Sequence, residues 1–499
     1  MKLSSNPETS GRYHTDWLNM MYPRLKLARN LLTDDGVIFI SIDEHEINNL
    51  LNLCNDIFGE FNFIENFIWI KNSTKNLSKT TSTNHEYIVC YCKNKDVVEE
   101  KQIFRKKKEC LDEVYSLLNI ASSQNKSLSE TQEILRKFYK DNPNLKGISM
   151  YNNIELDSLN KNHFQVYRLS DISAPKSTGK SATYDVIHPI TNKKCKVPSR
   201  GWGFTEETMK EHIKNNLIYF YDDETHVPQF KRYLNNVETE VIKSTFKDFT
   251  EGKKELITLF GEAYFDNAKP TTLFENFMNV HNDSLILDFF SGSSTIAHSI
   301  MKFNAKDNGN RKFILVQIAE EANEKSEAFK AGYENICEIG KERIRRAGDK
   351  IKSKSNNNDL DIGFKVFKLD SSNLNKWDPD YDNVQQKLLD SVDNVISGRS
   401  ELDLVYEIMI KYGIDLSLAI EEYNCGKWTI YSVGYGALLV CLDNNITKEI
   451  ADFIIKLKNK LDPLTLRVVF KDNGFKSDCD KTNIKETLKI NDIDEFITI

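Results

Sequence analysis

The chain has 499 residues, of which 40% are hydrophobic and 28% charged. This balance is typical of a soluble globular protein with room for two to four domains. No apolar run approaches the length of a membrane span and the N-terminus lacks a signal-peptide pattern, so we expect a cytoplasmic protein with no membrane partner. The nine cysteines are scattered. Cys90 and Cys92 share a face of an expected strand, but no second pair completes a zinc set, which favours free thiols and no metal site.

The formal net charge of −7 argues mildly against a nucleic-acid partner, but the charge is unevenly distributed. Residues 101–250 carry 24 Lys and Arg against 19 Asp and Glu, whereas residues 361–499 carry 17 against 24. The acidic excess therefore lies in the C-terminal part, and the middle of the chain is free to meet phosphate.

Helical and extended patterns alternate over the first hundred residues. Apolar spacing predicts a helix over residues 16–32, a buried strand over 37–42 and a second helix over 44–57. Residues 62–70 and 85–91 are expected to be strands. This order is typical of part of a doubly wound α/β sheet.

The middle of the chain holds two candidate DNA contacts. Lys106 and Lys107 belong to a basic run, 105–108, that is suited to the phosphate backbone or, equally, to a solvated helix face. Arg200 and Trp202 stand in a glycine-rich loop, where they would stack on a base or line a groove. Packing of Trp202 into a small core is the alternative, and both readings stay open.

Residues 284–295 predict a strand, a tight turn and the start of a helix, and the rest of the chain is organised around this segment. A short apolar strand ends at Asp288, small residues around Gly292 form a tight turn, and a helix begins near Thr295. This corner binds nucleotides in α/β sheets, and an acid at the strand end favours a ligand with an ammonium group or a ribose. An ordinary βα turn that binds nothing is the alternative. A second strand over 312–318, followed by Glu320, would place an acid near the ribose.

The C-terminal third shows no catalytic constellation. Residues 322–354 predict one long solvated or linking helix, with DNA contact as the less favoured alternative; its basic residues include Lys341, Arg343, Arg345 and Arg346. An asparagine-rich linker over 353–359 is then expected. Residues 362–499 predict an acidic α/β module with strands at 431–433 and 438–440.

Asp288-Phe289-Phe290-Ser291-Gly292-Ser293 resembles the S-adenosylmethionine motif of amino-methylating DNA methyltransferases. The particular subfamily is the adenine-N6-specific modification subunit of Type III restriction systems. The resemblance extends over nearly the whole chain, through the blocks Asp16-Trp17-Leu18-Asn19-Met20-Met21-Tyr22-Pro23-Arg24-Leu25, Gly36-Val37-Ile38-Phe39-Ile40-Ser41-Ile42-Asp43, Asn84-His85-Glu86-Tyr87, Arg200-Gly201-Trp202-Gly203-Phe204 and Asn310-Arg311-Lys312-Phe313-Ile314-Leu315-Val316-Gln317.

The resemblance implies a partial Rossmann-like methyltransferase sheet, circularly permuted, with an inserted target-recognition region and a C-terminal α/β module. Residues 1–97 would be the remaining part of the catalytic half, and 98–250 the target-recognition insertion. Residues 251–355 would be the cofactor-binding half with its linking helix, and 356–499 the acidic C-terminal module.

The resemblance also implies S-adenosylmethionine as cofactor. The residues expected to hold it are Asp288, Phe290, Gly292 and Ser293, supported by Lys269, Thr295 and Glu320. Asp288 would lie near the amino group of the ligand. Ser294 replaces the usual second glycine, and would strain the turn if the position needs a positive φ.

The catalytic Asp-Pro-Pro-Tyr motif that the family uses to hold the target adenine is absent from the sequence. The near match Asp378-Pro379-Asp380-Tyr381 lacks the second proline and the preceding strand. In the family the motif precedes the segment that begins here at Ser10, so we expect an N-terminally truncated chain that does not methylate alone.

Three readings follow: one chain of a split enzyme, an inactive gene remnant, or a non-catalytic DNA-recognition or assembly subunit. A dinucleotide oxidoreductase is remote, because a Gly-x-Gly-x-x-Gly turn is absent. The partners expected from the resemblance are double-stranded DNA, a second copy of the chain, a restriction (nuclease/helicase) subunit and a separate N-terminal fragment.

Overall fold

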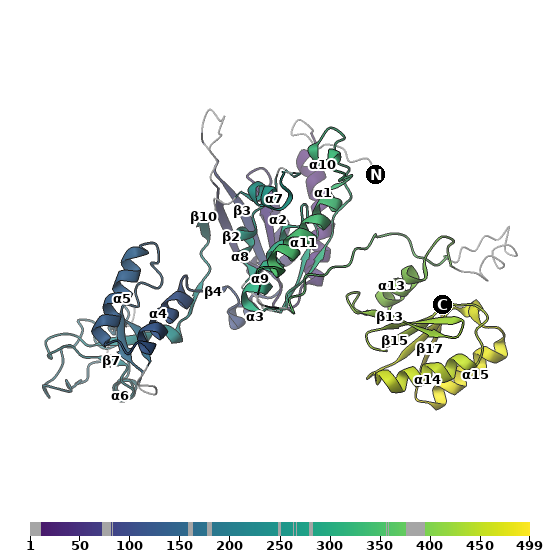
Figure 1. The fold of residues 1–499 in the computed structure, drawn as a ribbon. Coiled ribbons are helices and arrows are strands. Elements are labelled where there is room, and N and C mark those ends of the chain that lie inside the picture. The colour runs from purple at the N-terminus through teal and green to yellow at the C-terminus, as the bar shows by residue number, and fades with distance from the viewer. Residues whose placement is uncertain are drawn as a thin grey trace. The chain divides into compact units, whose positions relative to one another are not determined.

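The computed structural model describes residues 11–71, 81, 83–157, 163–176, 182–247, 251–262, 264–265, 267–278, 283–355, 357, 359–375 and 395–499. The chain divides into two compact units, Met1–Ile362 and Gly363–Ile499. Figure 1 follows the elements of both units from purple to yellow. The near match to the catalytic motif at residues 378–381 lies outside the described residues.

Unit 1 begins with a mixed four-stranded sheet in the order β1-β3-β2-β10. β3 pairs antiparallel with both β1 and β2, and β10 pairs parallel with β2. The elements of this region are α1 (Tyr13–Leu31), β1 (Val37–Ile42), α2 (Ile47–Phe58), β2 (Phe63–Ile70), β3 (His85–Cys92), α3 (Lys95–Lys101) and β10 (Thr245–Lys247). The predicted strands and helices are confirmed here, in a sheet that is mixed and not purely parallel.

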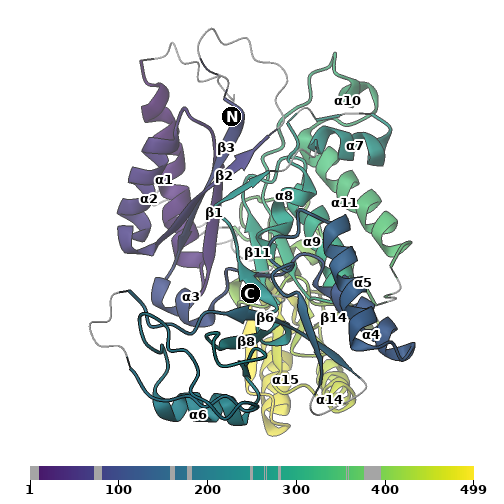
Figure 2. The ribbon, with the colours of Figure 1, turned by 90° about the vertical axis from the view of Figure 1, so that its left-hand side faces the viewer.

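Helices cover both faces of this sheet because its apolar side chains alternate. Ile38, Ile40 and Val89 pack against α1 and α2. Phe39 and Ile88 point to the other face, where they pack with side chains around α8 (Thr271–Glu275). Figure 2 shows α1 and α2 on one side of the strands and α8, α9 and α11 on the other.

A second, two-stranded parallel sheet contains the strand with the predicted turn. Its surroundings are α7 (Gly252–Phe260), β11 (Leu285–Asp288), α9 (Thr295–Asp307), β12 (Lys312–Leu315), α10 (Glu327–Lys330) and α11 (Ile336–Lys352). Ile286 and Phe313 face α9 and pack on Ile300 and Phe303. α8 joins the two sheets, because Phe274 contributes to the packing on both sides.

The other face of the β11–β12 sheet is open. Leu285, Leu287, Ile314 and Val316 are 64%, 36%, 48% and 50% exposed. Parallel strands are normally buried on both faces, and an unpaired strand edge is a site for pairing with another strand. Among the described residues, β11 pairs only with β12, and β1 pairs only with β3.

The chain between β3 and β10 forms its own cores. One consists of α4 and α5 with the strand β6, and another surrounds Trp202 and Met209. A four-stranded sheet has the order β5-β6-β8-β7, and β4 pairs with β9. The bounds are β4 (Arg105–Lys107), α4 (Leu111–Ser123), α5 (Leu128–Asp141), β5 (Asn153–Leu156), β6 (Phe164–Ser170), α6 (Glu206–Lys214), β7 (Ile218–Tyr219), β8 (Gln229–Tyr233) and β9 (Thr239–Val241).

Unit 2 is a five-stranded sheet in the order β13-β14-β15-β16-β17, covered on one face by α14 and α15 and on the other by α13. The bounds are α13 (Glu401–Lys411), β13 (Ile420–Cys425), β14 (Trp428–Val433), β15 (Leu438–Cys441), α14 (Glu449–Leu461), β16 (Arg467–Phe470), α15 (Asp478–Ile490) and β17 (Glu495–Thr498). Both strands predicted in this part of the chain are confirmed, since residues 431–433 lie in β14 and residues 438–440 in β15.

The prediction of one long solvated helix over 322–354 is wrong. The chain forms α10 and α11, separated by a turn in which Gly332 has a φ of 92°. The side chain of Asn335 then accepts from the backbone N–H groups of Cys337 and Glu338 and caps α11. α11 is amphipathic, and Arg343 lies on its buried face.

Candidate functional site: the turn after β11

The turn between β11 and α9 has the tight geometry that its sequence predicts. The N–H of Phe290 donates to Oδ1 of Asp288 at 3.1 Å, and the N–H of Ser294 donates to the carbonyl of Ser291 at 2.7 Å. Gly292 and Ser294 have φ angles of 50° and 59°. The position at which serine replaces the family's glycine is therefore left-handed, as the strain hypothesis requires.

The start of α9 offers backbone donors. Ser294 is the residue before the helix, and its side chain makes no capping hydrogen bond. The first N–H groups of a helix have no partner within the helix, and they favour a negatively charged or hydrogen-bond-accepting ligand.

Asp288 carries the charge of the site. Burial raises the pKa of its carboxyl group, while the hydrogen bond from Phe290 and the nearby Lys269 lower it. The Nζ of Lys269 also lies 3.9 Å from Oε2 of Glu86 on β3. Glu86 in turn pairs with Lys71. Lys269 thus links the turn to the first sheet by opposite charges, because it interacts with both Asp288 and Glu86.

The turn is also tied to the neighbouring strand. The N–H of Gly292 donates to Oε1 of Gln317 at 2.7 Å, and the N–H of Ser291 donates to the carbonyl of Val316 at 3.3 Å. Gln317 lies just after β12, in the segment from which Glu320 was expected to reach the ligand. β12 ends at Leu315, three residues before the predicted end, and Glu320 lies exposed five residues beyond it. The side-chain group that contacts the turn from this segment is the amide of Gln317.

The side chains of Ser293 and Thr295 face the protein and not the surface. Both are buried, and both hydroxyls accept hydrogen bonds from Nη1 of Arg343, at 2.9 Å and 2.6 Å. The two hydroxyls are therefore engaged within the protein. Phe290, by contrast, is 52% exposed beside the turn.

Arg343 is fully buried beneath the turn. Its Nη2 lies 3.6 Å from Oε2 of Glu255 on α7, an ion pair without a hydrogen bond. Burial lowers the pKa of Arg343 to about 10, and Glu255 opposes that shift. The guanidinium is therefore still charged at neutral pH. Glu255 also accepts from the N–H and the hydroxyl of Thr271, at 3.0 Å and 2.8 Å.

The candidate DNA contacts divide into exposed and buried residues. Lys107 is exposed, with an ion pair of 3.6 Å to Asp112, and Lys106 is half-buried on β4. The basic run is thus a strand and not a helix face. Lys108, at its end, is buried, and its Nζ donates to the carbonyl of Thr239 at 2.8 Å.

The tryptophan loop is a packing feature. Trp202 is 2% exposed, and its Nε1 donates to the carbonyl of Tyr184 at 2.9 Å. Its ring is enclosed by the insertion's own core, so stacking of Trp202 on a base does not fit the structure, and the packing alternative does. Arg200 remains exposed and pairs with Asp171 at 3.2 Å.

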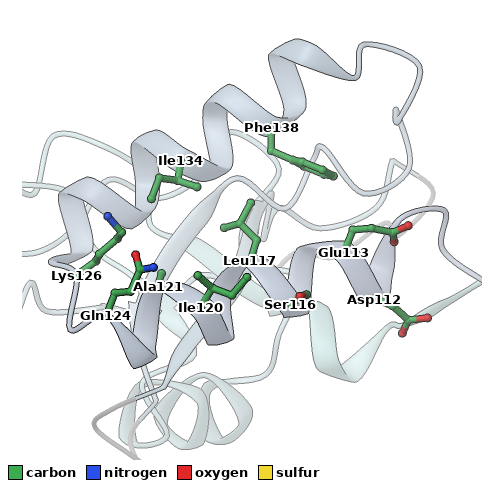
Figure 3. Close-up of a pocket in the computed structure, with 10 residues that line it drawn as sticks. All are labelled: Asp112, Glu113, Ser116, Leu117, Ile120, Ala121, Gln124, Lys126, Ile134 and Phe138. Carbon is green, nitrogen blue, oxygen red and sulfur yellow. The ribbon is translucent and has the colours of Figure 1, made fainter.

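An open hollow of about 590 Å³ lies between α4 and α5, away from the turn in sequence. Figure 3 shows its walls, which include Leu117, Ile120, Ile134 and Phe138. No residue of the predicted cofactor set lines it. It brings no chemistry to the site.

The described residues hold no group of three or more His, Cys, Asp or Glu side chains placed to bind a metal ion. In the part of the chain that the structure describes, every helix is too short or too polar to cross a membrane.

Sequence patterns did not identify Gln317, Glu255 or Arg343 as site residues. Gln317 belonged to the expected strand, and Arg343 to an expected solvated face. The available signal for Arg343 was the apolar spacing of Ile339, Ile344 and Ala347, which places residue 343 on the same buried stripe.

A strand that ends in an acid, a left-handed glycine turn and an uncapped helix start form the kind of corner at which α/β proteins often bind nucleotide-type cofactors. The sequence matches the DNA methylase family over residues 4–330, and the chain belongs to this family. It is 31% identical to the Type III restriction-modification enzyme EcoP15I Mod subunit of Escherichia coli, over 95% of this chain and 71% of that one. It is also 32% identical to the StyLTI Mod subunit of Salmonella typhimurium, over 71% of this chain and 49% of that one. The EcoPI Mod subunit of Escherichia phage P1 is 28% identical over 95% and 71%.

Proposed function

We propose that this chain is a subunit of a site-specific adenine-N6 DNA methyltransferase in a Type III restriction-modification system. Its turn after β11 would bind S-adenosylmethionine. The observation that carries the proposal is the Asp288–Thr295 corner in a chain similar to Mod subunits over 95% of its length. Relatives named as Type III Mod subunits favour this reading over a dinucleotide oxidoreductase.

The residues of the turn fit this cofactor by their chemistry. S-adenosylmethionine supplies an electrophilic methyl group when bound, together with an amino group, a carboxylate and a ribose. Asp288 would attract the amino group, and the N–H groups at the start of α9 would suit an oxygen acceptor. Phe290 offers an exposed aromatic surface, and Gly292 lets the backbone approach closely. Glu320 lies exposed five residues beyond the end of β12, whereas Gln317 contacts the turn directly, which favours Gln317 over Glu320 on this side.

Transfer to adenine needs a further group that holds the target amine. The sequence contains no Asp-Pro-Pro-Tyr motif. Positioning and electrostatics at the reacting amine supply much of the rate. We therefore expect the 499-residue chain alone to bind the cofactor without methylating DNA.

The open face of the β11–β12 sheet supports the split-enzyme reading. Its apolar residues and the unpaired edges of β11 and β1 suit a polypeptide that adds a strand and covers the face. We propose a separate fragment of the methyltransferase as this partner. DNA, a second copy of the chain and a restriction subunit are the further partners that the resemblance suggests.

A methyl-transfer assay tests the proposal. The purified chain is incubated with duplex DNA and S-adenosylmethionine that carries a radiolabelled methyl group. It is assayed alone and with the segment of a Mod relative that spans that family's catalytic motif. We expect label in adenine only in the mixture. Robust transfer by the chain alone would contradict the expectation that a chain without the Asp-Pro-Pro-Tyr motif does not methylate DNA.

The second candidate function is a non-catalytic DNA-recognition or assembly subunit, and an inactive remnant is the third. The region between β3 and β10 has hydrophobic cores of its own, as a recognition module would, and this is the observation behind the second candidate. Cofactor binding with no transfer in any mixture would support the second candidate.

A further inference from the structure

We propose that Arg343 is a positioning residue that sets the shape of the cofactor turn from beneath and couples it to the segment that carries Lys269. The inference rests on the proposed binding of S-adenosylmethionine by this turn. Arg343 itself touches no ligand, because it is fully buried and its hydrogen bonds go to Ser293 and Thr295.

Arg343 contacts the turn through one nitrogen atom. Nη1 donates to the hydroxyls of Ser293 and Thr295, which flank the left-handed Ser294. A single planar donor thereby fixes the spacing of the two residues on either side of the strained position. Charge-assisted hydrogen bonds of this kind are stronger than neutral ones.

The helix α11 packs closely against the same turn. Gly340 lies one helical turn before Arg343, and a Cβ atom there would lie 2.5 Å from Oγ of Ser294. The helix can therefore approach closely enough for the Arg343 side chain to reach both hydroxyls. Gly340 and Arg343 form one contact surface, since residues three apart share a helix face.

Arg343 is also connected, through Glu255 and Thr271, to the segment that carries Lys269. The guanidinium pairs with Glu255, whose carboxylate accepts from the N–H and hydroxyl of Thr271 at the start of α8. Thr271 is two residues after Lys269, the cation that acts on Asp288. α7 fits against this segment because a Cβ atom on Gly252 would lie 2.0 Å from the carbonyl oxygen of Ala268. Arg343 and Glu255 thus join both sides of the proposed cofactor site.

The burial of Arg343, paired with a Glu255 side chain that is 19% exposed, favours a positioning role over a purely stabilising one. Nε and Nη2 of Arg343 make no hydrogen bond. A buried ion pair contributes little net stability, because desolvation offsets the attraction, whereas it can specify one arrangement of the groups around it. We infer that the arrangement specified here is that of the turn.

The experiment compares Arg343→Met with Arg345→Met. Arg345 lies on the same helix, is 55% exposed and pairs with Glu342 at 3.5 Å, so it serves as the matched control. Calorimetric titration with S-adenosylmethionine is expected to give about tenfold weaker binding for Arg343→Met and unchanged binding for Arg345→Met. Arg343→Lys, which keeps the charge but not the planar fork, is expected to recover only part of the affinity.

Two readouts separate positioning from general stability. Hydrogen exchange of the amides of residues 291–297 in the ligand-free chain should be faster in Arg343→Met than in wild type. In the core of α2 exchange should be unchanged. Glu255→Gln should weaken binding more than the double variant Glu255→Gln/Arg343→Met, because the single change leaves a buried charge unpaired.

The outcomes distinguish this inference from the proposed function. If wild type binds S-adenosylmethionine and Arg343→Met binds equally well, the inference is wrong and the function stands. If wild type does not bind, the proposed cofactor is wrong, and the exchange rates in the turn still decide the role of Arg343. Faster exchange throughout unit 1 in Arg343→Met would overturn the inference in favour of a structural role.

Discussion

The side chain of Gln317 accepts a hydrogen bond from the backbone N–H of Gly292 at 2.7 Å, so the segment after β12 holds the turn after β11. The two strands are parallel neighbours, with Asp288 aligned to Leu315. Their carboxyl ends therefore form one edge of the sheet, at which the turn and the acid are presented together.

Removal of that acceptor should loosen the turn. Gln317→Leu leaves the partly buried N–H of Gly292 without its partner. We expect S-adenosylmethionine to bind up to about tenfold more weakly, because an unsatisfied donor costs about 1–3 kcal/mol when buried and less where water reaches it. Calorimetric titration measures the change. Gln317→Glu keeps an acceptor oxygen and is the control. Equal affinities for wild type and Gln317→Leu would show that the hydrogen bond does not shape the site.

Ser294 adopts a conformation that suits glycine. The left-handed region costs a non-glycine residue roughly 1–2 kcal/mol, which the lower entropy of the unfolded serine chain offsets in part. We expect Ser294→Gly to bind S-adenosylmethionine about two- to fivefold more tightly. Ser294→Ala keeps the Cβ atom and should bind as wild type does. An unchanged affinity in Ser294→Gly would retire the strain hypothesis.

His298 on α9 predicts a pH dependence of stability. Burial lowers its pKa to about 3, and Arg343, Lys302 and Lys350 contribute to the same shift. The folded state therefore keeps the imidazole neutral while the unfolded chain takes up a proton below about pH 6.5. The free energy of unfolding should be unaffected by this group above about pH 6.5 and should fall by about 1.4 kcal/mol for each pH unit below it.

Urea unfolding at about pH 7.5, 6.0 and 5.5, values that bracket the ordinary histidine pKa, measures this loss. His298→Gln removes the titrating group and is the control, since the other histidines of the chain remain. We expect a smaller loss of stability over this range in the variant than in wild type. Parallel curves for the two proteins would mean that folding does not lower the pKa of His298.

The lysines of strand β4 are candidates for contact with the phosphate backbone of DNA. Lys106→Ala/Lys107→Ala should weaken binding of any duplex sequence alike. It should also reduce the slope of log affinity against log salt by about 0.9 for each phosphate that the variant no longer neutralises. Fluorescence anisotropy with two unrelated duplexes at several salt concentrations measures both effects. Lys210→Ala, at an exposed pair with Glu206 on α6, is the control. Weaker binding of one duplex alone would instead indicate base recognition by these lysines.

Local patterns predicted much of the fold. The spacing of apolar residues predicted the order of elements from α1 to β3 and the strand, turn and helix around Asp288, because each of these elements has an apolar face that matches its own period. The same spacing did not separate α10 from α11. The boundary between the two helices lies at Gly332 and Asn335. A glycine or an asparagine alone is only a weak signal for the end or start of a helix.

The site was harder to predict than the turn at its centre. Asp288 and Gly292 stand in a local motif, whereas Arg343 and Glu255 meet the turn from helices that are distant in sequence. A buried arginine on an amphipathic helix looks like a solvated one unless its neighbours are known. Trp202 illustrates the reverse case, in which a loop composition suited to DNA serves the packing of a small core.

The central claim is that the turn after β11 binds S-adenosylmethionine, and calorimetric titration of the folded 499-residue chain tests it most directly. We predict saturable binding at one site per chain, lost in Asp288→Ala and retained in Lys210→Ala. Absence of heat from a folded sample, both alone and with a catalytic-motif segment of a Mod relative, would contradict the account and leave a remnant or a purely structural subunit.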